Sequence, residues 1–157
     1  MTVHTVSQRL QEAQRAIAQR NDPDWPVEES ERLLFVEAGG LFHLDFYGSP
    51  FGASFDEFLG LLGVDEVATR IRSFVLRGPD EGANGTRNWD LTRLVERDVR
   101  FPELISLFIE PTLPEHHNQT VVAQTYDEDG MITRLLEKTP RLQSLTVPRL
   151  RMPPSSR

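Results

Sequence analysis

The sequence contains no cysteine among its 157 residues, which excludes disulfide bonds, thiolate metal ligands and cysteine nucleophiles. It has no apolar run near the about 20 residues that cross a bilayer. Its N-terminus lacks the pattern of a secretory signal. Basic residues are outnumbered by acidic ones, 17 to 24, which argues against nucleic-acid or membrane-surface partners. These absences predict a cytoplasmic protein without nucleic-acid or membrane partners.

The residues that are present predict a folded domain. Apolar residues make up 38% of the chain and charged residues 26%, which is enough for a core and too little charge for a disordered chain. The length fits one domain, or one domain with a small appendage. The charge is uneven, since residues 141–157 hold four arginines and no acidic residue in a chain whose net charge is −7.

Residues 1–53 predict a helix and a β-hairpin that lead into the rest of the chain. Apolar residues recur at helical spacings of three and four at Val6, Leu10, Ala13 and Ile17, and Ser7 is the candidate N-cap. Two β-like runs, 32–37 and 41–47, are joined through Gly39-Gly40, and the second alternates apolar and polar residues. A tight connection of this kind favours an antiparallel hairpin.

An internal repeat dominates the remainder. The segments 71–76, 104–109 and 142–147 each have large apolar residues at positions one, four and six and serine at position three. They are separated by 33 and 38 residues, and matching helical stretches precede the last two. A further helix is predicted from Ser54, which has capping-box spacing to Glu57. A helical stretch followed by a strand-like segment, found twice in the same order, indicates repeated helix-then-strand units.

Such units cannot bury their apolar faces alone, so neighbouring units must stack. Their strands then run parallel, with right-handed helical crossovers. The predicted fold is therefore α/β. It is a short solenoid of three units over residues 54–147, with parallel strands and covering helices, preceded by the N-terminal helix and hairpin.

The three units resemble the leucine-rich-repeat family over about residues 54–147. They are most similar to the long-repeat, helix-containing type found in cytosolic bacterial proteins, and residues 125–147 carry the likeness best. The alternative is an ordinary α/β domain, because buried parallel strands resemble one another.

The chain also departs from that family. Asn or Cys usually follows the last strand leucine by three positions, whereas this chain has Pro79, Thr112 and Leu150. The units also exceed the usual length of about 20–29 residues. The excess lies in residues 77–88 and 110–130, which we interpret as loop insertions.

The resemblance implies a binding module that takes a partner, commonly a protein, on the open face of its sheet. Phe108 is the natural anchor there, and a solvated surface is the alternative interpretation. No catalytic activity and no cofactor are expected. The side chains that alternate with the buried ones on this face are Ser73, Val75, Arg77, Ser106, Phe108, Glu110, Ser144, Thr146 and Pro148.

The end of the chain is predicted to leave the last unit uncovered. Residues 148–157, PRLRMPPSSR, contain three prolines and are expected to form a disordered basic tail. The strand at 142–147 would then present an unpaired edge through which two copies could form a homodimer. A second hypothesis follows, in which the chain is a terminal fragment or cap of a longer array without activity of its own.

Several residues invite a chemical interpretation, and each has a simpler one. His116-His117 lack the spacing of a metal site. His43 and Asp45 share one side of a strand, but no nucleophile or orienting group accompanies them. The acidic residues at 127–129 lack the pattern of a calcium loop and are expected to stabilise the dipole of the following helix at its N-terminus. We therefore expect no metal site.

Two further features are assigned structural roles. The glycine-containing segment 78–86 lacks the lysine and spacing of a phosphate-binding loop and is interpreted as a flexible insertion. Trp25 and Trp89 flank predicted elements, and packing is the expected role of both.

Overall fold

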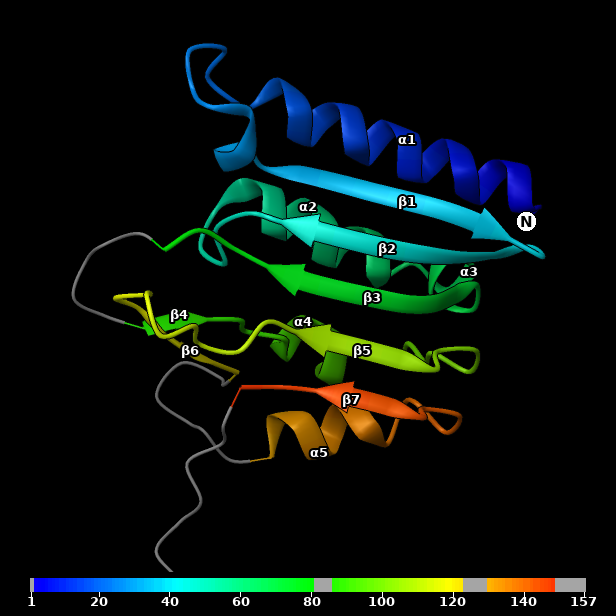
Figure 1. The fold of residues 1–157 in the computed structure, drawn as a ribbon. Helices are drawn as coiled ribbons and strands as arrows, with labels where there is room; N and C mark the ends of the chain where they lie inside the picture. Colours follow the sequence, from blue (N-terminus) through cyan, green and yellow to red (C-terminus); the bar gives the residue numbers. More distant parts are fainter. Residues whose placement is uncertain (1, 81–85, 123–129, 149–157) are drawn as a thin grey trace, which may run out of the picture.

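The computed structural model of the chain describes residues 2–80, 86–122 and 130–148 and has a mixed α/β fold (Figure 1). Its helices are α1 (Val3–Gln19), α2 (Ala53–Leu62), α3 (Asp65–Ala68), α4 (Thr92–Glu96) and α5 (Met131–Leu136), with a 3-10 turn, η1 (Val27–Glu29). Its strands are β1 (Arg32–Ala38), β2 (Leu41–Tyr47), β3 (Ile71–Arg77), β4 (Thr86–Asn88), β5 (Ser106–Ile109), β6 (Gln119–Val121) and β7 (Ser144–Thr146).

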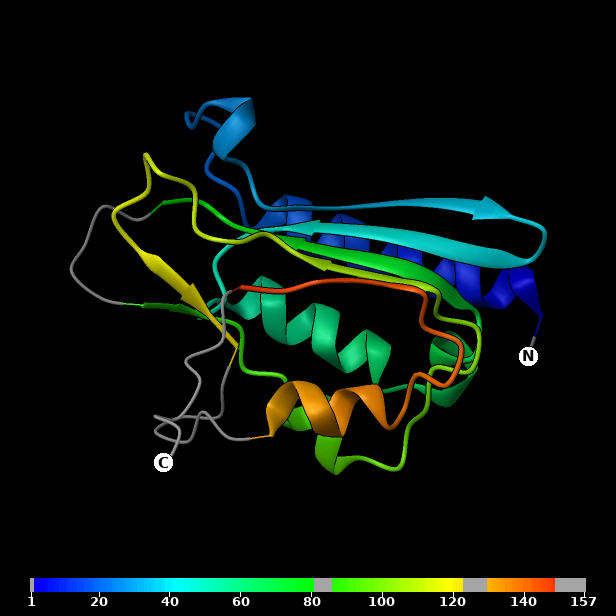
Figure 2. The same cartoon turned by 60° about the horizontal axis from the view of Figure 1, so that its bottom comes forward.

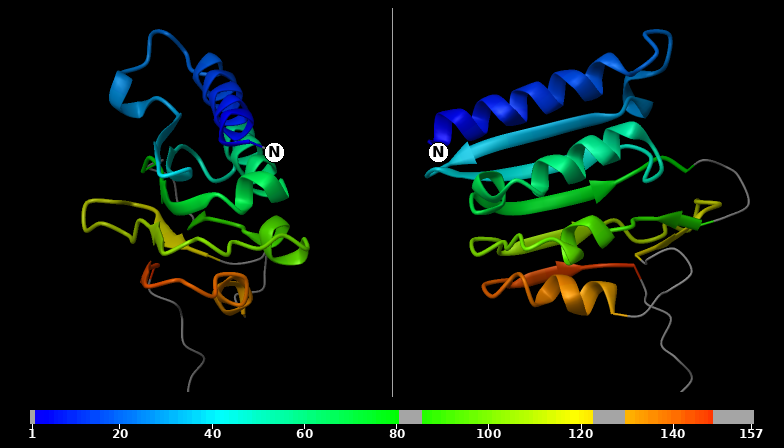
Figure 3. Two further views of the ribbon diagram at one scale, coloured as in Figure 1. Left: turned by 90° about the vertical axis from the view of Figure 1, so that its right-hand side faces the viewer. Right: turned by 180° about the vertical axis from the view of Figure 1, so that it is seen from behind.

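A five-stranded sheet in the order β1-β2-β3-β5-β7 organises the molecule. The β1–β2 pair is antiparallel and the other three pairs are parallel, so the predicted α/β class and mostly parallel sheet are confirmed. Helices α1 to α5 lie on one face of this sheet (Figures 2 and 3). The opposite face is not covered by any of these helices, and Figure 1 looks onto it.

The predicted hairpin is confirmed. Pairing runs from Arg32 opposite Tyr47 to Ala38 opposite Leu41. The two residues of the turn, Gly39 and Gly40, have φ angles of 62° and 83°. Two positive φ angles in a two-residue connection favour glycine and match the right-handed twist of the flanking strands.

The three segments aligned in the sequence lie side by side as β3, β5 and β7. Ser73 is the register partner of Ser106, and Ser106 is the register partner of Ser144. Each strand follows a helix in the chain, with α2 and α3 before β3, α4 before β5 and α5 before β7. The three aligned segments therefore occupy neighbouring parallel strands of one sheet.

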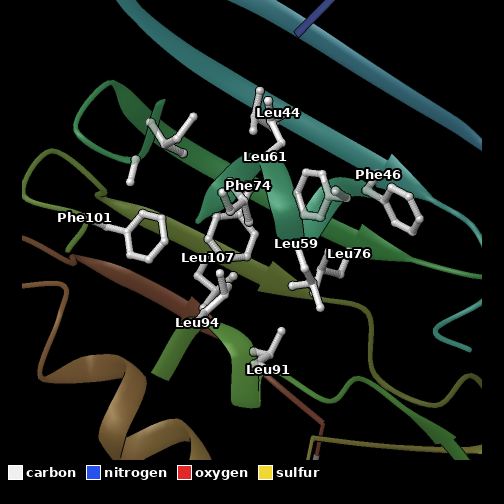
Figure 4. Packing of buried hydrophobic residues seen from close by; sticks show 14 of the residues in the cluster. Leu44, Phe46, Leu59, Leu61, Phe74, Leu76, Leu91, Leu94, Phe101 and Leu107 are labelled. Carbon is white, nitrogen blue, oxygen red and sulfur yellow. The ribbon is translucent and has the colours of Figure 1, made fainter. Parts of the chain in front are cut away.

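One hydrophobic cluster of the described residues extends from α1 to α5 beneath the sheet. Figure 4 shows its central part, where side chains of β2, α2, β3 and β5 meet. The buried residues of α1 are the four that its spacing predicts. Aromatic rings fill the centre, where Phe46 stacks on Phe58 at 5.1 Å and Phe58 meets Phe74 edge-on at 6.2 Å. The side chains that alternate with these along the strands form the opposite face.

Two helix starts differ from the predictions. The first helix is capped by Thr2, whose side chain accepts a hydrogen bond from the Thr5 N–H, and not by Ser7. The N-cap of α2 is Gly52. Ser54 lies inside α2 and donates to Glu31 Oε1 at 3.3 Å, so a tertiary contact to the segment before β1 takes its hydroxyl.

The two insertions are not loops throughout. β4 and β6 pair in parallel, with Thr86 opposite Gln119 and Asn88 opposite Val121. The interpretation of residues 77–88 and 110–130 as simple loops was therefore wrong for these strands. Residues 81–85 and 123–129, including the acids at 127–129, lie outside the described residues, as does the tail from 149 to 157.

Replacing Gly78 with alanine is expected to lower the free energy of unfolding by about 1–3 kcal/mol. A Cβ at Gly78 would lie 2.5 Å from the backbone oxygen of Gly48 and 3.3 Å from Trp89 Cζ2, and a backbone atom and the ring of a fully buried tryptophan cannot move aside as a flexible side chain can. Urea denaturation followed by circular dichroism measures the change.

Gly60 supplies the matched control for this prediction. It lies within α2, and its added Cβ would meet only the flexible end of Arg93 at 3.5 Å. Gly60→Ala should leave stability unchanged or raise it by up to about 1 kcal/mol, because alanine is the better helix former. Equal stabilities for the two variants would contradict the close approach at Gly78.

Candidate functional site

We call the side of the sheet that no helix covers the open face. The register of the strands arranges its side chains in rows. One row contains Val36, His43, Ser73, Ser106 and Ser144. The next contains Leu34, Asp45, Val75, Phe108 and Thr146. The third contains Arg32, Tyr47 and Arg77, with Glu110 following the end of β5.

The sequence-predicted site residues lie on this face with one exception. Arg77 and Ser144 are exposed, and Ser73, Val75, Ser106, Phe108, Glu110 and Thr146 are half-buried. Pro148 is buried, so its assignment to an exposed face was wrong. The prediction omitted the contribution of the hairpin, which adds Arg32, Leu34, Val36, His43, Asp45 and Tyr47. The alternation of the two hairpin strands was the signal that could have found them.

His43 and Ser73 form a hydrogen-bonded pair across β2 and β3. His43 Nδ1 lies 2.7 Å from Ser73 Oγ. Asp45, the other member of the pair considered in the sequence, belongs to the next row and lies opposite Val75. A nucleophilic serine needs an orienting group behind its base and donors for an oxyanion. The geometry supports a polar surface contact between the strands.

Guanidinium groups lie over aromatic rings at one end of the open face. The Arg32 Cζ is 4.2 Å from the centroid of the Tyr47 ring, and the Arg77 Cζ is 5.8 Å from that of Phe108. Burial raises the pKa of the Tyr47 hydroxyl, which Arg32 partly opposes. The phenol is therefore a protonated donor at neutral pH, and flat amphipathic groups of this kind are typical of binding surfaces.

Large apolar side chains are exposed beside these rows. Leu34 and Val36 lie on the open face itself. Trp25 is 56% exposed and Val27 is 82% exposed, so the expected packing role of Trp25 was wrong. Their segment, between α1 and β1, projects on the open-face side of the sheet, as does the segment after β5 (Figures 2 and 3).

The adjacent histidines, His116 and His117, bond to different residues of the insertions. Arg87, only 2% exposed, donates to His116 Nδ1 at 3.1 Å. His117 Nδ1 lies 2.8 Å from Asp80 Oδ2, and Asp80 also accepts from the His117 N–H. Among residues 2–80, 86–122 and 130–148, no three His, Cys, Asp or Glu side chains gather as metal ligands.

Two shallow cavities lie away from the predicted residues. One, of about 280 Å³, is lined by α2 and the start of α4, including Phe51, Asp56 and Arg93. The other, of about 410 Å³, lies at the opposite end of the strands and includes Leu41, Arg70 and Glu103. Neither contains a residue of the open-face prediction.

The last strand forms one edge of the sheet. Its pairing covers Ser144–Thr146, a shorter edge than the predicted 142–147. Leu145 of this strand and Leu136 of α5 are partly exposed, at 37% and 38%. Leu145 is thus less well covered than Phe74 of β3 and Leu107 of β5, which are each 1% exposed.

Comparison of the chain with known proteins finds no matching family model, and no curated protein or solved structure matches it significantly. In the described part of the chain, no helix combines the length and apolarity needed to cross a membrane.

Proposed function

We propose that this chain is a non-catalytic protein-binding module of the leucine-rich-repeat type, which holds its partner on the open face. The observation that carries the proposal is the arrangement of the sheet, with α1 to α5 on one face and in-register rows of side chains on the other. Evenly spaced parallel strands with helices on one side present a broad, pre-formed surface at little cost in conformational entropy.

The composition of the open face supports binding. Apolar side chains, Leu34, Val36, Val75 and Phe108, are interspersed with small serines and with guanidinium–aromatic contacts. Aromatic and arginine side chains are enriched where protein interfaces derive most of their energy. Serine in three neighbouring strands leaves room for close approach of a partner.

The second candidate is a terminal fragment or cap of a longer repeat array without activity of its own, in which the β7 edge would also let two copies form a homodimer. The exposure of Leu136 and Leu145 at the β7 edge favours it. An unpaired parallel edge can accept another strand. Sedimentation of the purified chain across a range of concentrations tests this candidate, because edge pairing predicts a dimer that Leu145→Glu disrupts.

The binding proposal predicts that Phe108→Glu combined with Ser106→Arg abolishes capture of a partner from an extract of the source cells. The double substitution places unlike charges and bulk in the centre of the open face without touching the helical side. An interface centre usually tolerates this poorly, and we expect at least about tenfold less bound partner. Quantitative mass spectrometry of the captured proteins measures the change.

The matched control carries the same kinds of substitution on the other side of the molecule. Phe51→Glu with Thr133→Arg alters an exposed phenylalanine and an exposed threonine away from the open face. This variant should retain the partner. A partner that survives the open-face variant, or that is lost equally from both, would refute binding at this face.

A further inference from the structure

The segment between α1 and β1 carries an unusual concentration of acidic side chains on the open-face side. Asp22, Asp24, Glu28 and Glu29 are all exposed, and residues 21–31 include no basic residue. Among the described residues, no arginine, lysine or histidine side chain lies within ion-pair distance of these four carboxylates. Their charge is available to a molecule that approaches the open face.

The helical side of the molecule differs, because ion pairs compensate some of its acids. Arg20 pairs with Glu57 at 3.4 Å, and Arg93 pairs with Asp56 at 3.8 Å. Both signs also alternate along the exposed parts of α1 and α4. Asp22, Asp24, Glu28 and Glu29 are therefore uncompensated by ion pairs on the side where the sheet is uncovered.

The arginines of the open face do not neutralise that segment through ion pairs. The Arg32 guanidinium lies over Tyr47 and donates to the carbonyl oxygens of Ser30 and Glu28. The Arg77 guanidinium lies toward Phe108. Both remain near aromatic rings within the rows, while the carboxylates stand at the margin of the face.

Apolar side chains accompany the uncompensated charge. Trp25 and Val27 are exposed within the acidic segment itself, and Leu34 and Val36 are exposed on β1 of the open face. An exposed tryptophan among carboxylates suits a partner that supplies cationic and apolar groups together, because the indole face attracts both.

We infer that the open face takes a protein partner that presents a basic segment with interspersed apolar residues. Its lysines or arginines meet the carboxylates of residues 21–31, and its apolar side chains cover Trp25, Val27 and the exposed part of β1. This inference rests on the proposed function and names the chemistry of the partner. Charge complementarity of this kind accelerates association and makes affinity depend on salt.

The test uses a labelled peptide of about twelve residues, built from Lys-Leu-Lys-Ser repeats, and its counterpart with glutamate in place of lysine. Fluorescence anisotropy with the full-length protein should show binding of the lysine peptide that weakens as salt rises, and no binding of the glutamate peptide. Glu28→Lys with Glu29→Lys should weaken binding at least about tenfold.

The control is Glu12→Lys with Glu137→Lys, which makes the same change in net charge at exposed positions of the helical side. It should weaken binding by less than about threefold, since charges beyond a Debye length are screened. Equal weakening by the two pairs would show that only net charge matters and would overturn the inference. Binding of the glutamate peptide as tightly as the lysine peptide would do the same.

Tryptophan emission gives a second readout. The lysine peptide should shift the emission of Trp25, and Trp25→Phe should abolish the shift, because the other tryptophan, Trp89, is fully buried.

A competing occupant of the open face is the segment 149–157 of the same chain, which has three arginines and no acidic residue. If its removal tightens peptide binding at least about tenfold, the face belongs to the chain's own tail and the inference fails.

Failure of this inference is distinguishable from failure of the proposed function. A native partner that is lost with Phe108→Glu and Ser106→Arg, but keeps its affinity with Glu28→Lys and Glu29→Lys and in high salt, would leave open-face binding intact and overturn the basic-partner inference. A partner unaffected by the Phe108 and Ser106 substitutions would instead remove the open-face proposal itself.

Discussion

Replacing Trp89 with alanine is expected to lower the free energy of unfolding by about 3–5 kcal/mol, the usual cost of deleting a large buried aromatic side chain. Trp89 is fully buried although it directly follows the short strand β4 at the end of the first insertion. Its ring meets Phe55 of α2 at 5.0 Å and Phe46 of β2 at 6.2 Å, both edge-on. The alanine variant would lose both contacts and leave a cavity between the insertion, the sheet and α2.

Urea denaturation followed by far-ultraviolet circular dichroism measures this loss, since the substitution removes a fluorescent reporter. Trp25→Ala is the control, because Trp25 is 56% exposed and its removal should change stability by no more than about 0.5 kcal/mol. Trp89→Phe should give an intermediate loss. Equal destabilisation by Trp25→Ala and Trp89→Ala would contradict the different burial of the two tryptophans.

Local patterns in the sequence predicted the elements whose stability depends on near neighbours. The spacing of Val6, Leu10, Ala13 and Ile17 predicted the buried stripe of α1, and two adjacent glycines predicted the hairpin turn. The repeated apolar spacing and the serine at its third position predicted strands that are now register partners. In each case the signal lies in residues close together in the sequence, as the spacing of apolar residues or as the residues of a turn.

Local patterns in the sequence do not encode contacts between distant residues. Ser54 has the spacing of a helix cap, but its hydroxyl bonds to Glu31, which is 23 positions away. Trp25 is a large aromatic residue of the kind that usually packs in a core, yet it is exposed. Packing depends on which distant parts of the chain lie near a residue. A local propensity is overridden wherever a tertiary partner competes for the same group.

The candidate site was likewise predictable only where it depends on local patterns. Alternation along each repeat strand placed the eight face residues that remain at the sheet surface, since successive side chains in a strand point to opposite faces. The partners of the β3 residues among them come from β2, and His43 bonds to Ser73, which is 30 positions away. The rows became visible only through the register between β2 and β3, which no single strand encodes.

The two insertions are joined by a buried arginine, Arg87, whose role no local pattern in the sequence indicates. Arg87 of β4 donates to the Thr120 hydroxyl of β6 from Nε at 3.1 Å and from Nη2 at 2.7 Å. Its Nη1 donates to the carbonyl oxygens of Gly78 and Pro79 at 2.9 and 3.0 Å. Because a guanidinium has only donors, the Nδ1 of His116 must be unprotonated to accept from Nη2.

Arg87→Leu is therefore expected to lower the free energy of unfolding by about 3 kcal/mol, because buried acceptors left without a donor cost about 1–3 kcal/mol each and water recovers part of that. Thr120→Val, which removes the shared hydroxyl, should cost less than Arg87→Leu. The double variant should cost less than the sum, because both act on one network. Arg141→Leu, at an exposed pair with Glu103, should cost at most about 1 kcal/mol. Full additivity of Arg87→Leu and Thr120→Val in urea denaturation would show that the two side chains do not act together and would contradict a shared hydrogen-bond network between the insertions.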